Sequence, residues 1–475
     1  CDNLSKKQIH HISVSKEGGH CIGIGANDWC FVWGEASYIG VLGLGTNTSA
    51  TTPFLVRSLR REKVKQTACS AFHSLCITEN MVIYAWGSKQ LTLLGVDTNE
   101  PTPLQFLNGK GLKCLSACNT HSLAWNPNAI EIYSFGMPGP WLGYDDGDNG
   151  GGSTRFGVMK FDSSIMGNDG FSITFADCSS QYSLVILNTG YVGACGINEH
   201  GRMGVGKKIQ SSAKVIWNRN LQNIVLCSGG SFHAGFVDTE GAVYTCGVGA
   251  DFRTGHGDKE TRWEPQRVES LKNIQVCQIE AVDSRTFVIT PQGNLIMVGK
   301  EPVSGRTHSG PFLYEYLNAY RMYDICGAQD FCVAIGIRAK EPIPKPKVDN
   351  VSVDAMNPNV QVDNMNRLIG DVIGNYHQLG TEQKFEVDSV YSTFIKMKKT
   401  TPDNSVKPMI YGKGGQGVPA PPPNAPPMGN IAWGGPGGGQ MGGGGGGPPP
   451  NVVYGGGGGG QQQQYGGSQM NMQNM

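Results

Sequence analysis

Two adjoining stretches decide the fold: AFHSLCIT at residues 71–78 and MVIYAWG at residues 81–87. β-Branched and aromatic residues fill each run, and Glu79 and Asn80 lie between them. This pattern is typical of two short strands joined by a polar turn. His73 in the first run and the Trp86-Gly87 pair in the second serve as markers, and both markers recur along the chain.

Positions equivalent to His73 lie about fifty residues apart, a period that indicates either propeller blades or a solenoid. These anchor positions are His20, His73, His121, Tyr182, His233, Arg285 and, more weakly, Asp330. Thirteen or fourteen residues after each of the first six comes an apolar residue or Cys followed by Gly: Trp33-Gly34, Trp86-Gly87, Phe135-Gly136, Cys195-Gly196, Cys246-Gly247 and Val298-Gly299. A fixed spacing inside a looser period predicts one repeated supersecondary unit.

A Gly-rich turn follows most of the Trp-Gly pairs, as in Leu42-Gly43 and Leu94-Gly95, and a proline such as Pro53 or Pro103 often comes next. Glycine permits a positive φ and a close backbone approach, and proline suits a connecting segment because it donates no hydrogen bond. We interpret these residues as structural.

Composition limits the classes of partner. The 475 residues include 38 Lys and Arg and 38 Asp and Glu, so the formal net charge is zero. No global field would attract nucleic acid or an anionic membrane. No apolar run reaches the length of a membrane span, and no signal peptide is evident, so we expect a soluble intracellular protein of the cytoplasm or nucleus.

The fourteen cysteines are spread through the repeats. Cys69 and Cys178 each lie four residues before an anchor, and Cys195 and Cys246 stand where other repeats have Trp. Small buried hydrophobic residues behave in this way, so we expect reduced core thiols and no disulfides.

The repeat resembles that of the regulator of chromosome condensation family: Gly-x-x-His-Ser, a Trp-Gly strand, Gly-x-Leu-Gly and then Pro. The match covers residues 1 to about 338 and is strongest over residues 18–53 and 72–103. The resemblance implies an all-β, seven-bladed β-propeller of four-stranded antiparallel blades. Residues 4–14 look like the second half of a repeat, so we expect the chain to begin within a blade and the amino-terminal blade to be incomplete.

Beyond the predicted propeller (residues 1–338) we expect a linker with one or two short helices (residues 339–411) and a disordered Gly/Pro/Gln-rich tail (residues 412–475). The helices would either pack on the propeller or dock in a partner's groove. The proline runs of the tail would act either as solvated spacers or as ligands for an aromatic groove in a partner.

The anchor histidines invite a metal or catalytic role. Equivalent positions in a propeller are held about a blade apart, however, which is beyond the reach of a shared metal ion. A ring nitrogen bonded to the neighbouring strand accounts for the pattern, so we predict structural anchors, no catalytic residue, no cofactor and no metal. No Arg follows Arg367, so the tail lacks the Arg-Gly repeats of single-strand binders, which argues against nucleic-acid binding.

The interval between His121 and Tyr182 is the longest and contains aromatic and acidic residues. It is either a tolerated insertion or a binding loop on a rigid scaffold. In the founding member of the resembled family, a wedge projecting from one blade displaces nucleotide from the small GTPase Ran. The resemblance therefore implies a guanine-nucleotide exchange factor, without covalent chemistry, that contacts a Ran-like GTPase through Trp141, Tyr144, Asp145, Asp146 and Asp148. The alternative is a non-enzymatic scaffold whose Pro-rich tail recruits a second protein.

Overall fold

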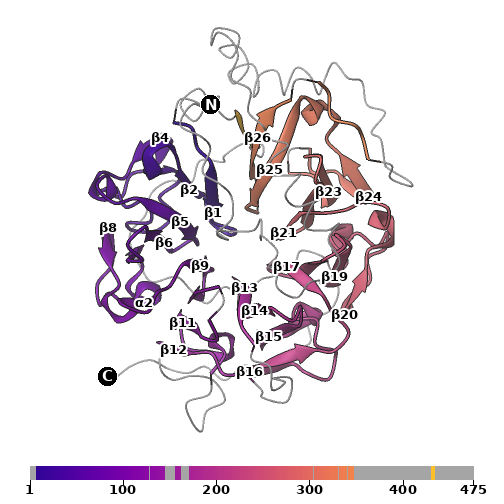
Figure 1. Ribbon diagram of the computed structural model, residues 1–475, viewed down its shortest axis with the longest axis horizontal. Helices are drawn as coiled ribbons and strands as arrows, with labels where there is room; N and C mark the ends of the chain where they lie inside the picture. The colour runs from indigo at the N-terminus through magenta and orange to yellow at the C-terminus, as the bar shows by residue number, and fades with distance from the viewer. Residues whose placement is uncertain are drawn as a thin grey trace, which may run out of the picture. The chain divides into compact units, whose positions relative to one another are not determined.

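The computed structural model describes residues 7–127, 129–144, 156–161, 171–302, 304–329, 331–339, 341–346 and 429–433. Within these residues the β-strands form seven sheets that follow one another around a central axis in the order of the sequence (Figure 1). Six sheets have four strands and the seventh has three. The expected all-β propeller of four-stranded antiparallel sheets is confirmed.

The strands of the first three sheets are β1 (His11–Val14), β2 (His20–Ile24), β3 (Cys30–Gly34) and β4 (Ala50–Leu55); β5 (Val64–Cys69), β6 (His73–Thr78), β7 (Ile83–Gly87) and β8 (Thr98–Pro103); and β9 (Cys114–Ala117), β10 (His121–Trp125), β11 (Ile132–Gly136) and β12 (Phe156–Val158). Those of the fourth, fifth and sixth sheets are β13 (Ile173–Ser179), β14 (Tyr182–Leu187), β15 (Val192–Ile197) and β16 (Ser211–Asn218); β17 (Ile224–Gly229), β18 (His233–Asp238), β19 (Val243–Gly247) and β20 (Arg262–Arg267); and β21 (Gln278–Val282), β22 (Arg285–Ile289), β23 (Leu295–Lys300) and β24 (Thr307–Leu313). The seventh sheet contains β25 (Tyr320–Gly327), β26 (Cys332–Arg338) and β27 (Gly429–Trp433).

Helical elements among the described residues are single turns. They are α2 (Lys89–Thr92) and the 3-10 turns η1 (Ala26–Asp28), η2 (Arg57–Leu59), η3 (Gln105–Leu107), η4 (Pro140–Leu142), η6 (Glu199–Gly201), η7 (Ala250–Phe252), η8 (Glu269–Leu271) and η9 (Glu315–Ala319). None of these turns has the length or apolar character needed to cross a lipid bilayer.

The hydrophobic core lies between the sheets. Each of seven clusters of buried residues takes its members from two neighbouring sheets, and one of them joins Ile12 and Cys21 of the first sheet to Val333 of the seventh. A sheet with two apolar faces cannot bury both of them alone, so closing the ring removes every apolar face from water. The thirteen described cysteines are all buried and free of disulfide bonds.

The glycine of the Trp-Gly pair packs closely against the backbone of the adjacent strand. Gly87 pairs with His73 and has a φ of 101°, and a Cβ there would lie 2.5 Å from the carbonyl oxygen of Phe72. The pairing of β7 with β8 shifts register between Ala85 and Gly87. Glycine is therefore required both by the backbone conformation and by the close approach.

The expected place of the incomplete blade was wrong. Residues 11–14 form β1, the first strand of a complete first sheet, and the sheet with fewer strands is the seventh, which takes only β25 and β26 from the repeats. The stretch before His20 resembles the stretch before His233 because both form the first strand of a sheet.

The carboxyl-terminal part differs from expectation at one place. The composition predicts a tail without regular structure from residue 412, whereas residues 429–433 form β27. The predicted helices lie within residues 347–428, outside the described residues, and so do the remaining residues of the tail. Asp330, the predicted anchor of the seventh sheet, also lies outside the described residues. The anchor position of this sheet is held by Phe331 instead. The Ala328 N–H donates to the Phe331 carbonyl, as the Ser70 N–H donates to the His73 carbonyl in the second sheet.

Replacing Gly87 tests this close approach. Gly87→Ala should lower the free energy of unfolding by roughly 3 kcal/mol, since both the positive φ and the contact with Phe72 oppose a Cβ. Gly95→Ala is the matched control, because Gly95 has a φ of 82° but an added Cβ would meet nothing within 4 Å. Only the conformational cost of about 1 kcal/mol is expected there. Urea unfolding of both variants measures the difference, and equal losses would contradict the role given to Phe72.

Candidate functional site

The anchor side chains join neighbouring sheets. His20, His73 and His121 place Nε2 at 2.9, 2.6 and 2.6 Å from the hydroxyls of Ser74, Ser122 and Ser183, each of which follows the anchor of the next sheet. His233 does the same with Thr286 at 2.8 Å. These histidines are completely buried, so the hydrogen bonds are shielded from water.

The anchors that are not histidine bond differently. The Tyr182 hydroxyl donates to the Gly230 carbonyl of the next sheet at 2.7 Å, and Arg285 Nε donates to the Lys300 carbonyl at 2.7 Å within its own sheet. Tyr182 thus keeps the inter-sheet contact of the histidines. The Trp86 indole N–H donates to the Val41 carbonyl of the first sheet at 2.8 Å, and Trp33 is half-buried in the cluster between the seventh and first sheets.

The hydroxyl that meets each ring determines the histidine tautomer. The Ser183 hydroxyl donates its one hydrogen to the Trp141 carbonyl at 2.9 Å, so it must accept from His121 Nε2–H. In the neutral ring, Nδ1 of His121 then carries a lone pair. Ser74 and Thr286 donate to carbonyls in the same way, which leaves lone pairs on Nδ1 of His20 and His233.

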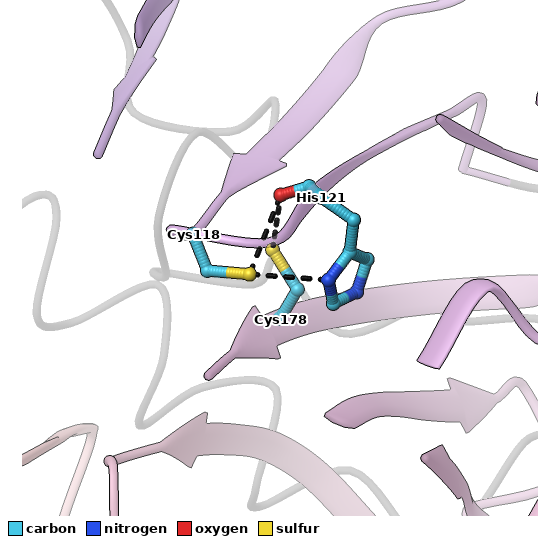
Figure 2. A group of neighbouring side chains, drawn as sticks. All are labelled: Cys118, His121 and Cys178. Atoms are coloured by element: carbon cyan, nitrogen blue, oxygen red, sulfur yellow. Dashed lines mark hydrogen bonds between the residues drawn. The ribbon is translucent and has the colours of Figure 1, made fainter. Parts of the chain in front are cut away.

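At His121 this nitrogen faces two sulfur atoms. Cys118, in the turn between β9 and β10, has its Sγ 3.2 Å from His121 Nδ1, and Cys178 of β13 comes from the next sheet (Figure 2). The three potential ligand atoms lie within 4.8 Å of one another, and all three side chains are buried. Both thiols also point toward the His121 carbonyl oxygen, at 3.3 and 3.8 Å (Figure 2).

The two cysteines of this cluster have opposite pKa shifts. Burial by itself would raise the pKa of Cys118, but a hydrogen bond from Cys178 and, when its imidazole is protonated, the adjacent His121 bring that pKa well below its ordinary value. Burial raises the pKa of Cys178, and its hydrogen bond with Cys118 adds to that rise. Cys118 is therefore the sulfur that more readily carries the negative charge.

Two thiolates and one imidazole are a donor set that suits a soft cation, and the Ser183 bond to Nε2 would orient the imidazole toward it. Within the described residues no fourth His, Cys, Asp or Glu joins them. This cluster could not be predicted from the sequence, because Cys178 reaches the other two residues only through the packing of two sheets. The Cys118-x-x-His121 spacing was its only local signal.

A second group of charged side chains lies at the connection between β1 and β2. Residues 16–19 lie between the hydrogen-bonded Ser15 and His20, whereas only residues 71 and 72 lie between Ser70 and His73. The longer connection carries Lys16 to Asp177 of the fourth sheet, with 3.3 Å between Nζ and Oδ2, and to the carbonyl of Gly229. Asp177 is 1% exposed, so Lys16 neutralises a buried carboxylate.

Glu17 extends the same link. It accepts hydrogen bonds from Asn119, Ser180 and Ser231, which belong to the third, fourth and fifth sheets. Burial raises the pKa of Glu17 above its ordinary value, although the hydroxyls of Ser180 and Ser231 oppose that rise. The connection thus crosses from the first sheet to the sheets on the far side of the ring.

The residues predicted to contact a partner are only partly described. Asp145, Asp146 and Asp148 lie outside the described residues. Tyr144 is 4% exposed and packs against Gly157, whereas Trp141 is half-buried and its indole N–H donates to the Met137 carbonyl at 3.0 Å. The Trp141 carbonyl accepts from Ser183, as the Val41 carbonyl accepts from Ser74, so Pro140–Leu142 belongs to the regular repeat and the added residues begin after it.

A groove opens beside Trp141. Its lining comes from the third, fourth and fifth sheets: Pro140, Ile197, Glu199, His200, Ser211 and Trp263. We call it the rim groove. One face of the ring carries the connections between the first and second strands and between the third and fourth strands of each sheet. We call it the anchor face, and the rim groove lies on it. Glu199 pairs with His200 at 3.7 Å and with Arg202 at 3.7 Å, and Lys207 lies 5.9 Å from the Trp263 ring centre.

Comparison with known proteins agrees with the repeat. The family model "Regulator of chromosome condensation (RCC1) repeat" matches residues 28–77 and 240–289. Human E3 ubiquitin-protein ligase HERC2 is 26% identical over 319 residues, which cover 66% of this chain and 6% of that protein. The ultraviolet-B receptor UVR8 of Arabidopsis thaliana is 23% identical over 288 residues, covering 59% of this chain and 63% of the receptor.

The solved structures are similar in fold. Prp20p of Saccharomyces cerevisiae, a structure described with its binding properties to Gsp1p and histones, has a TM-score of 0.58 at 15% identity and covers 76% of this chain and 86% of its own. Human WBSCR16 has a TM-score of 0.55 at 16% identity, covering 65% and 86%.

The anchor histidines predict a pH dependence. Burial lowers the pKa of His73 from 6.5 to about 4, so the folded state disfavours its protonation. The stability that this neutral histidine contributes is complete above pH 6.5 and is lost as the pH falls from 6.5 through 4. His73→Gln does not titrate and retains an amide that can reach Ser122.

Urea unfolding at pH 7.5 and pH 5.0 should show that the wild type loses about 2 kcal/mol more than the variant over this interval. Comparing the two proteins cancels the opposite effect of buried acids such as Asp324, whose pKa is raised to about 6 chiefly by burial. Equal losses would contradict a neutral buried His73.

Cys118 stands where the second sheet has Ser70, whose hydroxyl lies 2.7 Å from His73 Nδ1. Cys118→Ser should therefore preserve the bond to His121, whereas Cys118→Ala should cost up to about 1 kcal/mol more, because Nδ1 then keeps only the Thr120 hydroxyl, 2.9 Å away. Unfolding of both variants under reducing conditions measures the difference. Equal stability would show that the Cys118 bond to His121 contributes nothing.

The matching family model, the repeated register and the similar folds lead to one conclusion: the chain is a β-propeller of regulator-of-chromosome-condensation-type repeats.

Proposed function

We propose that this protein-binding propeller engages a Ran-like small GTPase on its anchor face and promotes release of the bound nucleotide. The rim groove is the observation that carries the proposal. It combines an aromatic side chain, Trp263, with the carboxylate of Glu199 and the imidazole of His200, and it opens beside Trp141, a few positions before residues 145–155.

Apolar and aromatic surface next to polar groups suits a protein partner better than a small metabolite, since the groove is open rather than enclosed. Both the founding family member, which acts on Ran, and the binding of Prp20p to Gsp1p support a GTPase as the partner. Trp141 would supply apolar contact at the edge of the groove. Asp145, Asp146 and Asp148 would then disturb the phosphate and magnesium site of the GTPase.

Exchange activity requires no cofactor. The propeller must bind the nucleotide-free GTPase more tightly than the loaded form, and a coupling free energy of 1–3 kcal/mol corresponds to about 5–150-fold. Carboxylates presented to a magnesium-bound phosphate meet this requirement, since their repulsion is felt only in the loaded state. The buried Tyr144 would hold the start of the loop rather than contact the partner.

Release of a fluorescent guanine nucleotide from Ran and related GTPases tests the proposal. Catalytic amounts of the intact chain should accelerate release, and both Trp263→Ala and the triple variant D145N/D146N/D148N should reduce the acceleration at least about 5-fold. Val96→Ala is the matched control, because Val96 is an apolar side chain of the second sheet, 64% exposed on the same face but outside the groove.

Thermal unfolding of each variant shows whether the fold is retained. If the intact chain accelerates release from none of these GTPases, exchange activity is excluded. Binding without release would leave the scaffold as the function of the anchor face. If the control loses activity with the groove variants, the rim groove is not the contact.

A further inference from the structure

The seventh sheet lacks a third strand from the repeats. In each of the other six sheets, the second strand pairs with a third strand that carries an apolar residue or Cys followed by Gly at or next to its last position. After β26 ends at Arg338, residues 339 and 341–346 form no strand. β26 would therefore present a free row of backbone N–H and C=O groups to any strand that could pair with it.

The structure pairs β26 with a segment of the tail. β27 runs antiparallel to β26, with Cys332 opposite Trp433, Ala334 opposite Ile431 and Gly336 opposite Gly429. In Figure 1 this strand is the short yellow arrow beside β26. The backbone of β27 thus occupies the place of a third strand.

The register of this pair is that of the repeat. Phe331 holds the anchor position of the seventh sheet, so Cys332 corresponds to Ser74, the residue after the anchor His73. Ser74 lies opposite Trp86, and Cys332 lies opposite Trp433. The first sheet has the same arrangement, in which Cys21 after His20 lies opposite Trp33.

The sequence agrees independently of the pairing. Residues 432–434 read Ala-Trp-Gly, as do residues 85–87 at the end of β7. Trp433 is the last of the eight tryptophans and follows Trp263 by 170 positions, in a tail of Gly, Pro and Gln. The same motif thus pairs in the same register in the second and seventh sheets.

We propose that residues 429–433 are the third strand of the seventh sheet and that the tail of this chain closes the propeller as a strap. Residues 339–428 are long enough to return the tail to β26, because the entropic cost of loop closure rises only slowly with length. Main-chain hydrogen bonds supply the affinity, as in other cases of strand addition to a sheet edge. This proposal does not depend on the partner of the anchor face.

Hydrogen exchange of the full chain tests the strap. Alternate residues of an antiparallel strand bond to one neighbour, so adjacent prolines at 431 and 432 must remove a bond to β26. In the variant I431P/A432P, the amides of Cys332–Arg338 that face β27 should exchange at least about 10-fold faster, whereas those that face β25 keep their protection. Q440P/M441P is the matched control and should exchange like the wild type.

The oligomeric state shows whether the third strand comes from the same chain or from a second copy. Light scattering should give a monomer in which the slow exchange does not depend on protein concentration. Wild-type exchange that is unchanged in I431P/A432P would overturn the proposal, since another segment would then cover β26 or nothing would. Protection that appears only in a dimer would mean that the strand comes from a second copy, and this would overturn it as well.

Discussion

In five of the seven sheets, a hydrogen bond from a buried anchor side chain to the next sheet sets the relation between the two neighbours. His73 reaches Ser122, and the serine in turn follows the anchor of its own sheet. Because the bond is buried, losing either partner would leave a polar group without water, so the sheets keep one spacing and one rotation. The seven apolar clusters fill the space that this spacing defines.

The repeat could be predicted from the sequence because its markers are local. His73, Trp86 and Gly87 lie within one hairpin, and their spacing follows from strand length and the tight turn. The structural reason for Gly87 also lies close by, at the Phe72 carbonyl. Cys118 and Cys178 show the limit of such reasoning, since they meet only when two sheets pack and no spacing along the chain encodes this contact.

The place of the incomplete sheet was mispredicted for a related reason. A periodic sequence does not say where a blade begins, since every cut through the period gives an equivalent unit. The structure begins the first sheet at His11 and leaves the shortage at β26. The composition of the tail did not predict β27, because a short Ala-Trp-Gly segment changes little in the average composition of a stretch dominated by glycine. The rim groove also escaped prediction, since Pro140, Glu199 and Trp263 come from three sheets.

The connection that contains Lys16 and Glu17 has a mechanical consequence. In an open ring of sheets, strain at the seam between first and last would be relieved by splaying those two apart. Here Lys16 and Glu17 bond to the third, fourth and fifth sheets, and the Lys16 carbonyl accepts from the Gln329 N–H in the seventh. Splaying the seam would break bonds on the opposite side of the molecule. Fraying at one edge is therefore coupled to the whole circumference, and the repeats lose the independence that an open solenoid would give them.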